Sequence, residues 1–91
     1  MVRAKTLLNV LEQAATECGL TVRRDKGNFQ SGRCIVKGQR VVFVNRAHPI
    51  EFQLSVLAKA LQGEPIDDFP MRPAVREAVR QLMQESSLAS P

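Results

Sequence analysis

The side chains that could carry covalent or metal chemistry are few in this chain. It has one histidine, His48, and two cysteines, Cys18 and Cys34. A zinc site needs three or four histidine, cysteine or carboxylate ligands, so a built-in site is not expected. The cysteines lack the Cys-x-x-Cys spacing of a redox pair and are too few for a disulfide framework. We therefore expect no cofactor and no metal, and we interpret both cysteines as small buried apolar residues in a reducing compartment.

Sequence motifs for hydrolysis or phosphate binding are missing as well. No Gly-x-Ser-x-Gly elbow is present, and the glycine turns at 26–28 and 31–33 do not form Gly-x-x-x-x-Gly-Lys. His48 precedes Pro49, a position typical of a helix cap or a surface residue. The sequence thus favours a non-enzymatic protein, and a small enzyme using Cys34 or His48 stays open as the weakest alternative.

Positive charge is concentrated in the middle of the chain. Residues 20–48 carry seven Lys or Arg against Asp25 alone, within a net charge of +4 for the whole chain. Such a cluster suits phosphate groups, so a nucleic-acid-binding module is the alternative function. Its expected contacts are Arg23, Arg24, Lys26, Arg33, Lys37, Arg40 and Arg46. Single-strand binders add exposed aromatic residues, however, and this chain has no Trp or Tyr. Two other roles for these charges stay open. Lys and Arg at strand edges block edge-to-edge pairing, and the basic residues can also contact the more acidic residues 49–91 of another copy head to tail.

The elements that must position these residues follow from the hydrophobic pattern. Helical spacing of apolar residues predicts a first helix over 4–18, which Gly19 closes. Extended patterns then predict three strands, at 20–24, 29–36 and 40–45. A tight hairpin turn is expected at Lys37-Gly38 or Gly38-Gln39. We expect the three strands to form a small antiparallel sheet.

Two more helices complete the expected α+β domain. The second begins near His48-Pro49, is apolar around most of its circumference and ends at Gly63, so it should be buried on most sides. The third runs from Pro73 to about Gln84. The predicted order is α-β-β-β-α-α, with the helices mainly on one face of the sheet. Residues 1–85 form the single domain and 86–91 a flexible C-terminal tail.

Surplus apolar surface suggests the leading function. In the strand at 40–45, Val42 and Val44 point to one face and Val41 and Phe43 to the other, so the strand should be central and covered on both sides. A chain of this length buries only about 60–65% of its unfolded surface and gains from a partner. We therefore expect a protein-interaction module that self-associates, for example as a homodimer, or binds another protein. The expected interface residues are Val42, Val44, Phe52 and Val56.

No membrane contact is expected. No apolar run approaches the roughly 18 residues that a bilayer span requires. Asn9 and Glu12 interrupt the apolar N-terminal stretch, which argues against a signal peptide. The cytoplasm is the expected location.

The strand Val42-Phe43-Val44-Asn45 and the helix after it resemble part of a known family. They are similar to the strand and active-site helix of zincin-like metallopeptidases of the ImmA/IrrE kind, where the helix carries Leu-Ala-His-Glu-Leu-Gly-His. Leu57-Ala58 and Leu61 match that pattern, whereas the two His and the Glu are replaced by Lys59, Gly63 and Ala60. The resemblance implies a degenerate, metal-free scaffold, because zinc needs the paired imidazoles and the Glu activates the water. In general style the chain also resembles short bacterial proteins of unknown function.

Overall fold

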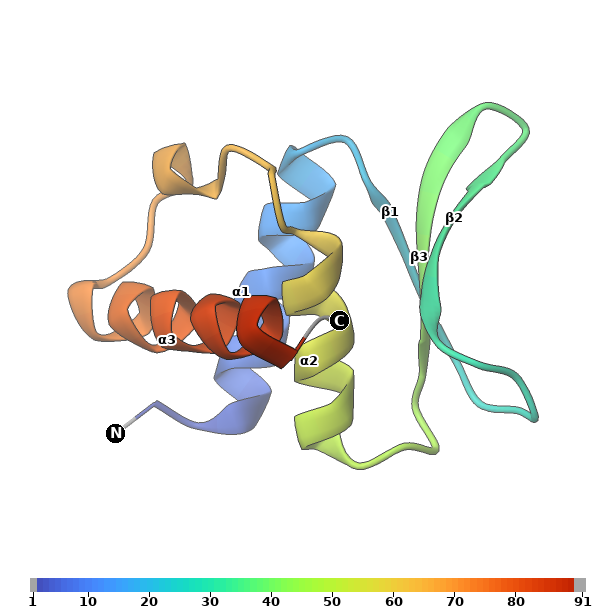
Figure 1. Cartoon of the computed structure of the whole chain (residues 1–91), viewed down its shortest axis with the longest axis horizontal. Helices are drawn as coiled ribbons and strands as arrows, with labels where there is room; N and C mark the ends of the chain where they lie inside the picture. Colours follow the sequence, from blue (N-terminus) through green and yellow to red (C-terminus); the bar gives the residue numbers. More distant parts are fainter. Residues whose placement is uncertain (1, 90–91) are drawn as a thin grey trace.

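Three helices lie on one side of a three-stranded sheet in the computed structural model, which describes residues 2–89 and the side chains of residues 2–85 (Figure 1). The elements are α1 (Ala4–Glu17), β1 (Thr21–Asp25), β2 (Gly32–Val36), β3 (Gln39–Asn45), α2 (Ile50–Ala60), the 3-10 turn η1 (Ile66–Asp68) and α3 (Pro73–Ala89). The predicted α+β class and order are confirmed, with η1 added in the connection before α3.

The sheet is mixed, so the expectation of an antiparallel sheet is wrong for one pair of strands. Its order is β1-β3-β2, with β3 in the centre. β2 and β3 form the expected hairpin, and Lys37 and Gly38 take positive φ angles of 51° and 80° at its turn. β1 instead runs parallel to β3, with Thr21 opposite Val41. Residues 26–31 therefore cross the end of β3 rather than turning back as a hairpin.

Asn45, at the end of β3, holds this crossing segment in place. Its side-chain Nδ2 donates to the carbonyl oxygens of Gly27 and Phe29, each at 2.8 Å. Its Oδ1 accepts from the N–H of Ala47 at 3.0 Å, and its backbone N–H donates to Ser31 Oγ at 2.9 Å. Only 2% of Asn45 is exposed. A buried amide needs such partners, and here they fix the segment that carries the chain from one sheet edge to the other.

The helix boundaries largely follow the sequence signals. Gly19 directly follows the C-cap of α1 with a φ angle of +88°, the left-handed conformation expected of a helix-closing glycine. Gly63 also has a positive φ, +84°, but α2 ends earlier than expected, at Ala60 with Leu61 as its C-cap, so Gly63 lies in the turn after the helix. Pro49 is the N-cap of α2 rather than its first helical residue. α3 continues to Ala89, so the expected tail beginning at residue 86 is helical through Ala89, and residues 90 and 91 lie outside the described part.

The core lies between the helices and the inner face of the sheet. α2 packs against both α1 and α3, which cover most of its apolar circumference. Val42 and Val44 of β3 point into this core and are fully buried. Val41 and Phe43 point to the outer face, where no helix of residues 2–89 lies (Figure 1). None of the helices described is long and apolar enough to cross a membrane.

Candidate protein-interaction surface

β2 forms one edge of the sheet and carries little protection against pairing. Within the described residues it pairs only with β3. Its last three residues are Cys34, Ile35 and Val36, and Ile35 and Val36 are 73% and 42% exposed. The opposite edge, β1, ends in Arg23-Arg24-Asp25. Charged residues at a strand edge discourage the addition of another strand, so β2 is the more open edge.

The register of the hairpin assigns each β2 side chain to a face. Arg33 pairs with Val42 and Ile35 with Arg40, so these side chains share the face toward the helices. Cys34 pairs with Val41 and points to the outer face. Figure 1 shows the hairpin tip projecting past the helical layer. Ile35 therefore faces the helical side of the sheet and yet remains exposed.

A groove of about 570 Å³ separates the start of β2 from α2. Phe52, the large apolar side chain of this groove, is 49% exposed, and its ring meets the imidazole of His48 edge to face at 4.9 Å. Phe52 and Val56 supply the apolar part of the α2 wall, whereas the opposite wall is small and polar. Each wall carries one basic residue, Lys59 on α2 and Arg33 on β2. The lining residues are Ser31, Gly32, Arg33, Phe52, Ser55, Val56, Lys59 and Ala60.

Two arginines of the hairpin and one glutamate fix the position of β2 against the helices. Arg33 Nη2 and Arg40 Nη1 lie 3.5 and 2.9 Å from the same oxygen, Glu64 Oε2. Arg33 Nη1 also donates to the carbonyl oxygen of Ala60 at 2.9 Å, and Arg40 Nη2 donates to that of Cys18. These carbonyls end α2 and α1, where the helix dipole favours a positive charge. The cluster therefore serves the fold and holds one wall of the groove.

Of the four interface residues expected from sequence, two lie at the surface groove and two are buried in the core. Phe52 and Val56 line the groove. Val42 and Val44 are 0% exposed beneath the helices, so they belong to the chain's own core and are not available to a partner. Sequence reasoning missed Ile35. Its signal is the uncharged run Cys34–Val36 in a short strand, but that run is equally typical of a buried strand.

The seven basic residues do not form one surface. Arg33 and Arg40 bind Glu64, and Arg24 lies 3.4 Å from Glu12 on α1. Arg23 is on the outer face of β1, Lys37 is at the hairpin tip, and Lys26 and Arg46 lie at the opposite end of the sheet. The positive stretch in the sequence is therefore divided between two faces and two ends of the sheet.

The two cysteines lie in different environments, and neither is the fully buried residue that we expected. Cys34 is exposed because β2 is an edge strand and its side chain points away from the helices. Cys18 is half-buried at the end of α1. Burial raises the pKa of the Cys18 thiol, the Glu64 carboxylate raises it further, and Arg40 opposes both. A raised pKa makes Cys18 a poor nucleophile at neutral pH.

Comparisons with protein-family models, with curated proteins and with solved structures give no match. The similarity to zincin-like metallopeptidases therefore stays a prediction from sequence. α2 ends at Ala60, so Lys59 and Gly63 do not share a helix face as a metal-binding pair would. Fold and surface together define a small α+β domain in which β2, the less charged edge of the sheet, adjoins a groove.

Proposed function

We propose that this protein is a non-enzymatic interaction module that self-associates through the β2 edge and the groove beside it. One observation carries the proposal. The exposed large apolar residues among those described are Ile35, Val36 and Phe52. Ile35 and Val36 lie on β2, and Phe52 lies on the helix wall that faces the start of β2.

The physical argument for association combines two costs. An open strand edge leaves N–H and C=O groups without protein partners and acts as a template for another strand. Exposed apolar side chains gain roughly 25 cal/mol for each Å² removed from water. A partner strand along β2 bonds the open N–H and C=O groups and also covers exposed apolar side chains. Both effects arise in one contact because Phe52 and Val56 line the groove beside the start of β2. Apolar residues beside a polar rim such as Arg33 and Lys59 are typical of association surfaces.

Sedimentation equilibrium of the purified chain at several concentrations tests this proposal. We expect a reversible dimer in the micromolar range. Phe52→Glu should raise the dissociation constant about tenfold or more, since it loses apolar contact and places a charge at the interface. Gln81→Glu is the matched control, because it adds the same charge at an exposed position of α3. A chain that remains strictly monomeric at high micromolar concentration contradicts self-association.

A further inference from the structure

We infer that the association is a two-fold antiparallel pairing of β2 with β2 of a second copy, with the symmetry axis at Cys34. This inference rests on the proposed self-association and specifies its geometry. It follows from the hydrogen-bonding direction of β2, from the charges along it and from the position of Ile35.

The hairpin turn fixes which backbone groups of β2 point outward. Lys37 and Gly38 both take positive φ, which defines a two-residue type I′ turn. In such a hairpin the flanking pair, Val36 and Gln39, is hydrogen-bonded, and bonded pairs then alternate along the strands. Cys34 therefore directs its N–H and C=O toward β3. Arg33 and Ile35 direct theirs to the open edge, where a second strand can bind them.

Charge selects one register among the three two-fold registers whose axis lies at Arg33, Cys34 or Ile35. An axis at Arg33 places Arg33 directly opposite its own copy. An axis at Ile35 places Arg33 opposite Lys37 of the second copy. Like charges directly opposite each other destabilise a strand pair. An axis at Cys34 pairs Arg33 with Ile35 in both directions and sets Cys34 against Cys34, so this register avoids like charges.

The same register covers the exposed side chains. Arg33 lines the groove, so Ile35 of the second copy lies beside the groove mouth, near its apolar wall. The arrangement is reciprocal, as a two-fold interface requires. Ile35, which is 73% exposed, thereby gains apolar surroundings in both copies. The Glu64 carboxylate, which Arg33 shares with Arg40, lies 3.5 Å from Arg33 Nη2 and reduces the repulsion between the two copies of Arg33 on the diagonal.

The pairing also ends at two copies. Joining the two sheets through β2 leaves β1 at both outer edges. β1 presents Arg23, Arg24 and Asp25 there, and charged edges resist further strand addition. The expected assembly is a closed dimer with one continuous sheet rather than a filament.

Disulfide trapping tests the register. In a Cys18→Ser chain, Cys34 should meet Cys34 of the second copy as a non-hydrogen-bonded pair, about 4.5 Å apart at Cα, within disulfide range. A diazene oxidant, which takes up the two electrons and two protons that the thiols release, should then give a covalent dimer. The control chain carries Cys18→Ser, Cys34→Ser and Val36→Cys, which moves the thiol along the same face to a position opposite Gly32. We expect trapping at position 34 to be on the order of a hundredfold faster, since a paired thiol has an effective concentration near millimolar. Equal rates for the two chains overturn the register.

A proline substitution tests the strand pairing itself. Ile35→Pro removes an N–H of the open edge and none of the β2–β3 bonds, so the fold should persist, as circular dichroism will show. We expect this variant to be monomeric, whereas Ile35→Val should remain a dimer. A folded Ile35→Pro dimer overturns the inference and leaves self-association standing, and a wild-type monomer overturns both. A chain that stays monomeric and binds an extended peptide from another protein along β2 also overturns the inference, because the partner of this edge is then not a second copy.

Discussion

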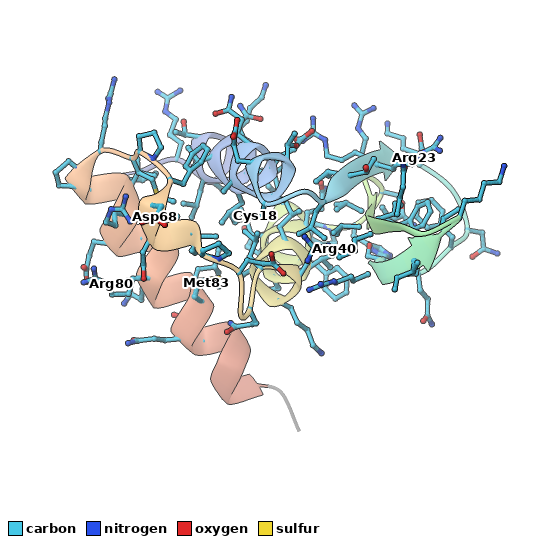
Figure 2. The ribbon with its side chains drawn as sticks, turned by 90° about the horizontal axis from the view of Figure 1, so that it is seen from above. Cys18, Arg23, Arg40, Asp68, Arg80 and Met83 are labelled. Carbon is cyan, nitrogen blue, oxygen red and sulfur yellow. The ribbon has the colours of Figure 1, made fainter. Side chains whose placement is uncertain are left out.

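Arg40 Nη1 lies 2.9 Å from Glu64 Oε2, and this ion pair joins the hairpin to the segment that follows α2. The other arm of the Arg40 guanidinium donates to the carbonyl oxygen of Cys18 at the end of α1. Figure 2 shows Arg40 between the sheet and the helices, close to Cys18. Arg33 binds the same carboxylate and donates to the carbonyl oxygen of Ala60 at the end of α2. The two arginines therefore bond the C-terminal ends of two helices and share the negative charge of Glu64. The position of β2, and with it the groove, depends on Glu64.

Glu64→Gln should destabilise the chain by about 1–3 kcal/mol, because two guanidinium groups lose a shared carboxylate that is only 12% exposed. Urea unfolding measured by circular dichroism gives this free energy. Glu77→Gln is the control, since its ion pair with Arg80 is 72% exposed on the glutamate side and should change stability by less than about 0.5 kcal/mol. An equal effect of the two substitutions would show that the cluster does not stabilise the fold.

Asn45→Asp should cost about 2–4 kcal/mol, since a carboxylate cannot donate to the carbonyl oxygens of Gly27 and Phe29 and is itself buried. Unfolding in urea measures the loss. Hydrogen exchange should show faster amide exchange in residues 26–31, because Asn45 holds this segment across β3. Asn28→Asp, at an exposed position of the same segment, is the matched control. If the control is as damaging as Asn45→Asp, the hydrogen bonds of Asn45 do not hold the crossing.

Thiol reactivity should separate the two cysteines. At protein concentrations low enough to keep the chain monomeric, a thiol reagent at pH 8 should modify Cys34 first, because it is exposed. Cys18 should react later and accelerate as pH rises, since burial and the Glu64 carboxylate raise its pKa. Mass spectrometry of the modified peptides gives both rates. Faster modification of Cys18 would contradict the placement of the two thiols.

The raised pKa of Cys18 also predicts a pH dependence of stability. The folded chain holds the proton more tightly than the unfolded chain, so this contribution is complete below the unfolded pKa and is lost as pH rises through the folded pKa. Stability should therefore decline on the alkaline side, and Cys18→Ser should reduce that decline. Urea midpoints from neutral to alkaline pH measure the effect. An unchanged alkaline decline in Cys18→Ser would assign it to another group.

Nucleic-acid binding, if present, should have a shallow salt dependence. Seven phosphate contacts on a single strand would give a slope of about −5 in log K against log salt. The separation of Arg23, Lys37 and Arg46 on the sheet, and the commitment of Arg33 and Arg40 to Glu64, leave far fewer contacts for one strand. Fluorescence anisotropy with a labelled oligonucleotide at several salt concentrations measures the slope. A slope near the full value would revive the nucleic-acid function and contradict the separation of the charges.

Local signals in the sequence determined the helices and turns. Gly19 closes α1 because glycine adopts positive φ without steric cost, and Gly38 supplies one of the two positive φ angles of the hairpin turn for the same reason. The apolar spacing of α2 also indicated that Phe52 and Val56 exceed what its own core needs, and both line the groove. These features depend on residues close together in the chain, which is why sequence alone could predict them.

Only the tertiary structure decided the order of the strands and, with it, which side chains are exposed. Alternation along a strand specifies two faces but not its neighbours, so the six residues between β1 and β2 suggested a hairpin. Hydrogen bonds from Asn45 to Gly27 and Phe29 instead take this segment across β3. That crossing makes β2 an edge strand and exposes Ile35, while Val42 and Val44 are buried beneath the helices. Whether an apolar residue becomes core or surface depends on what packs over it, and that is a property of contacts distant in the chain.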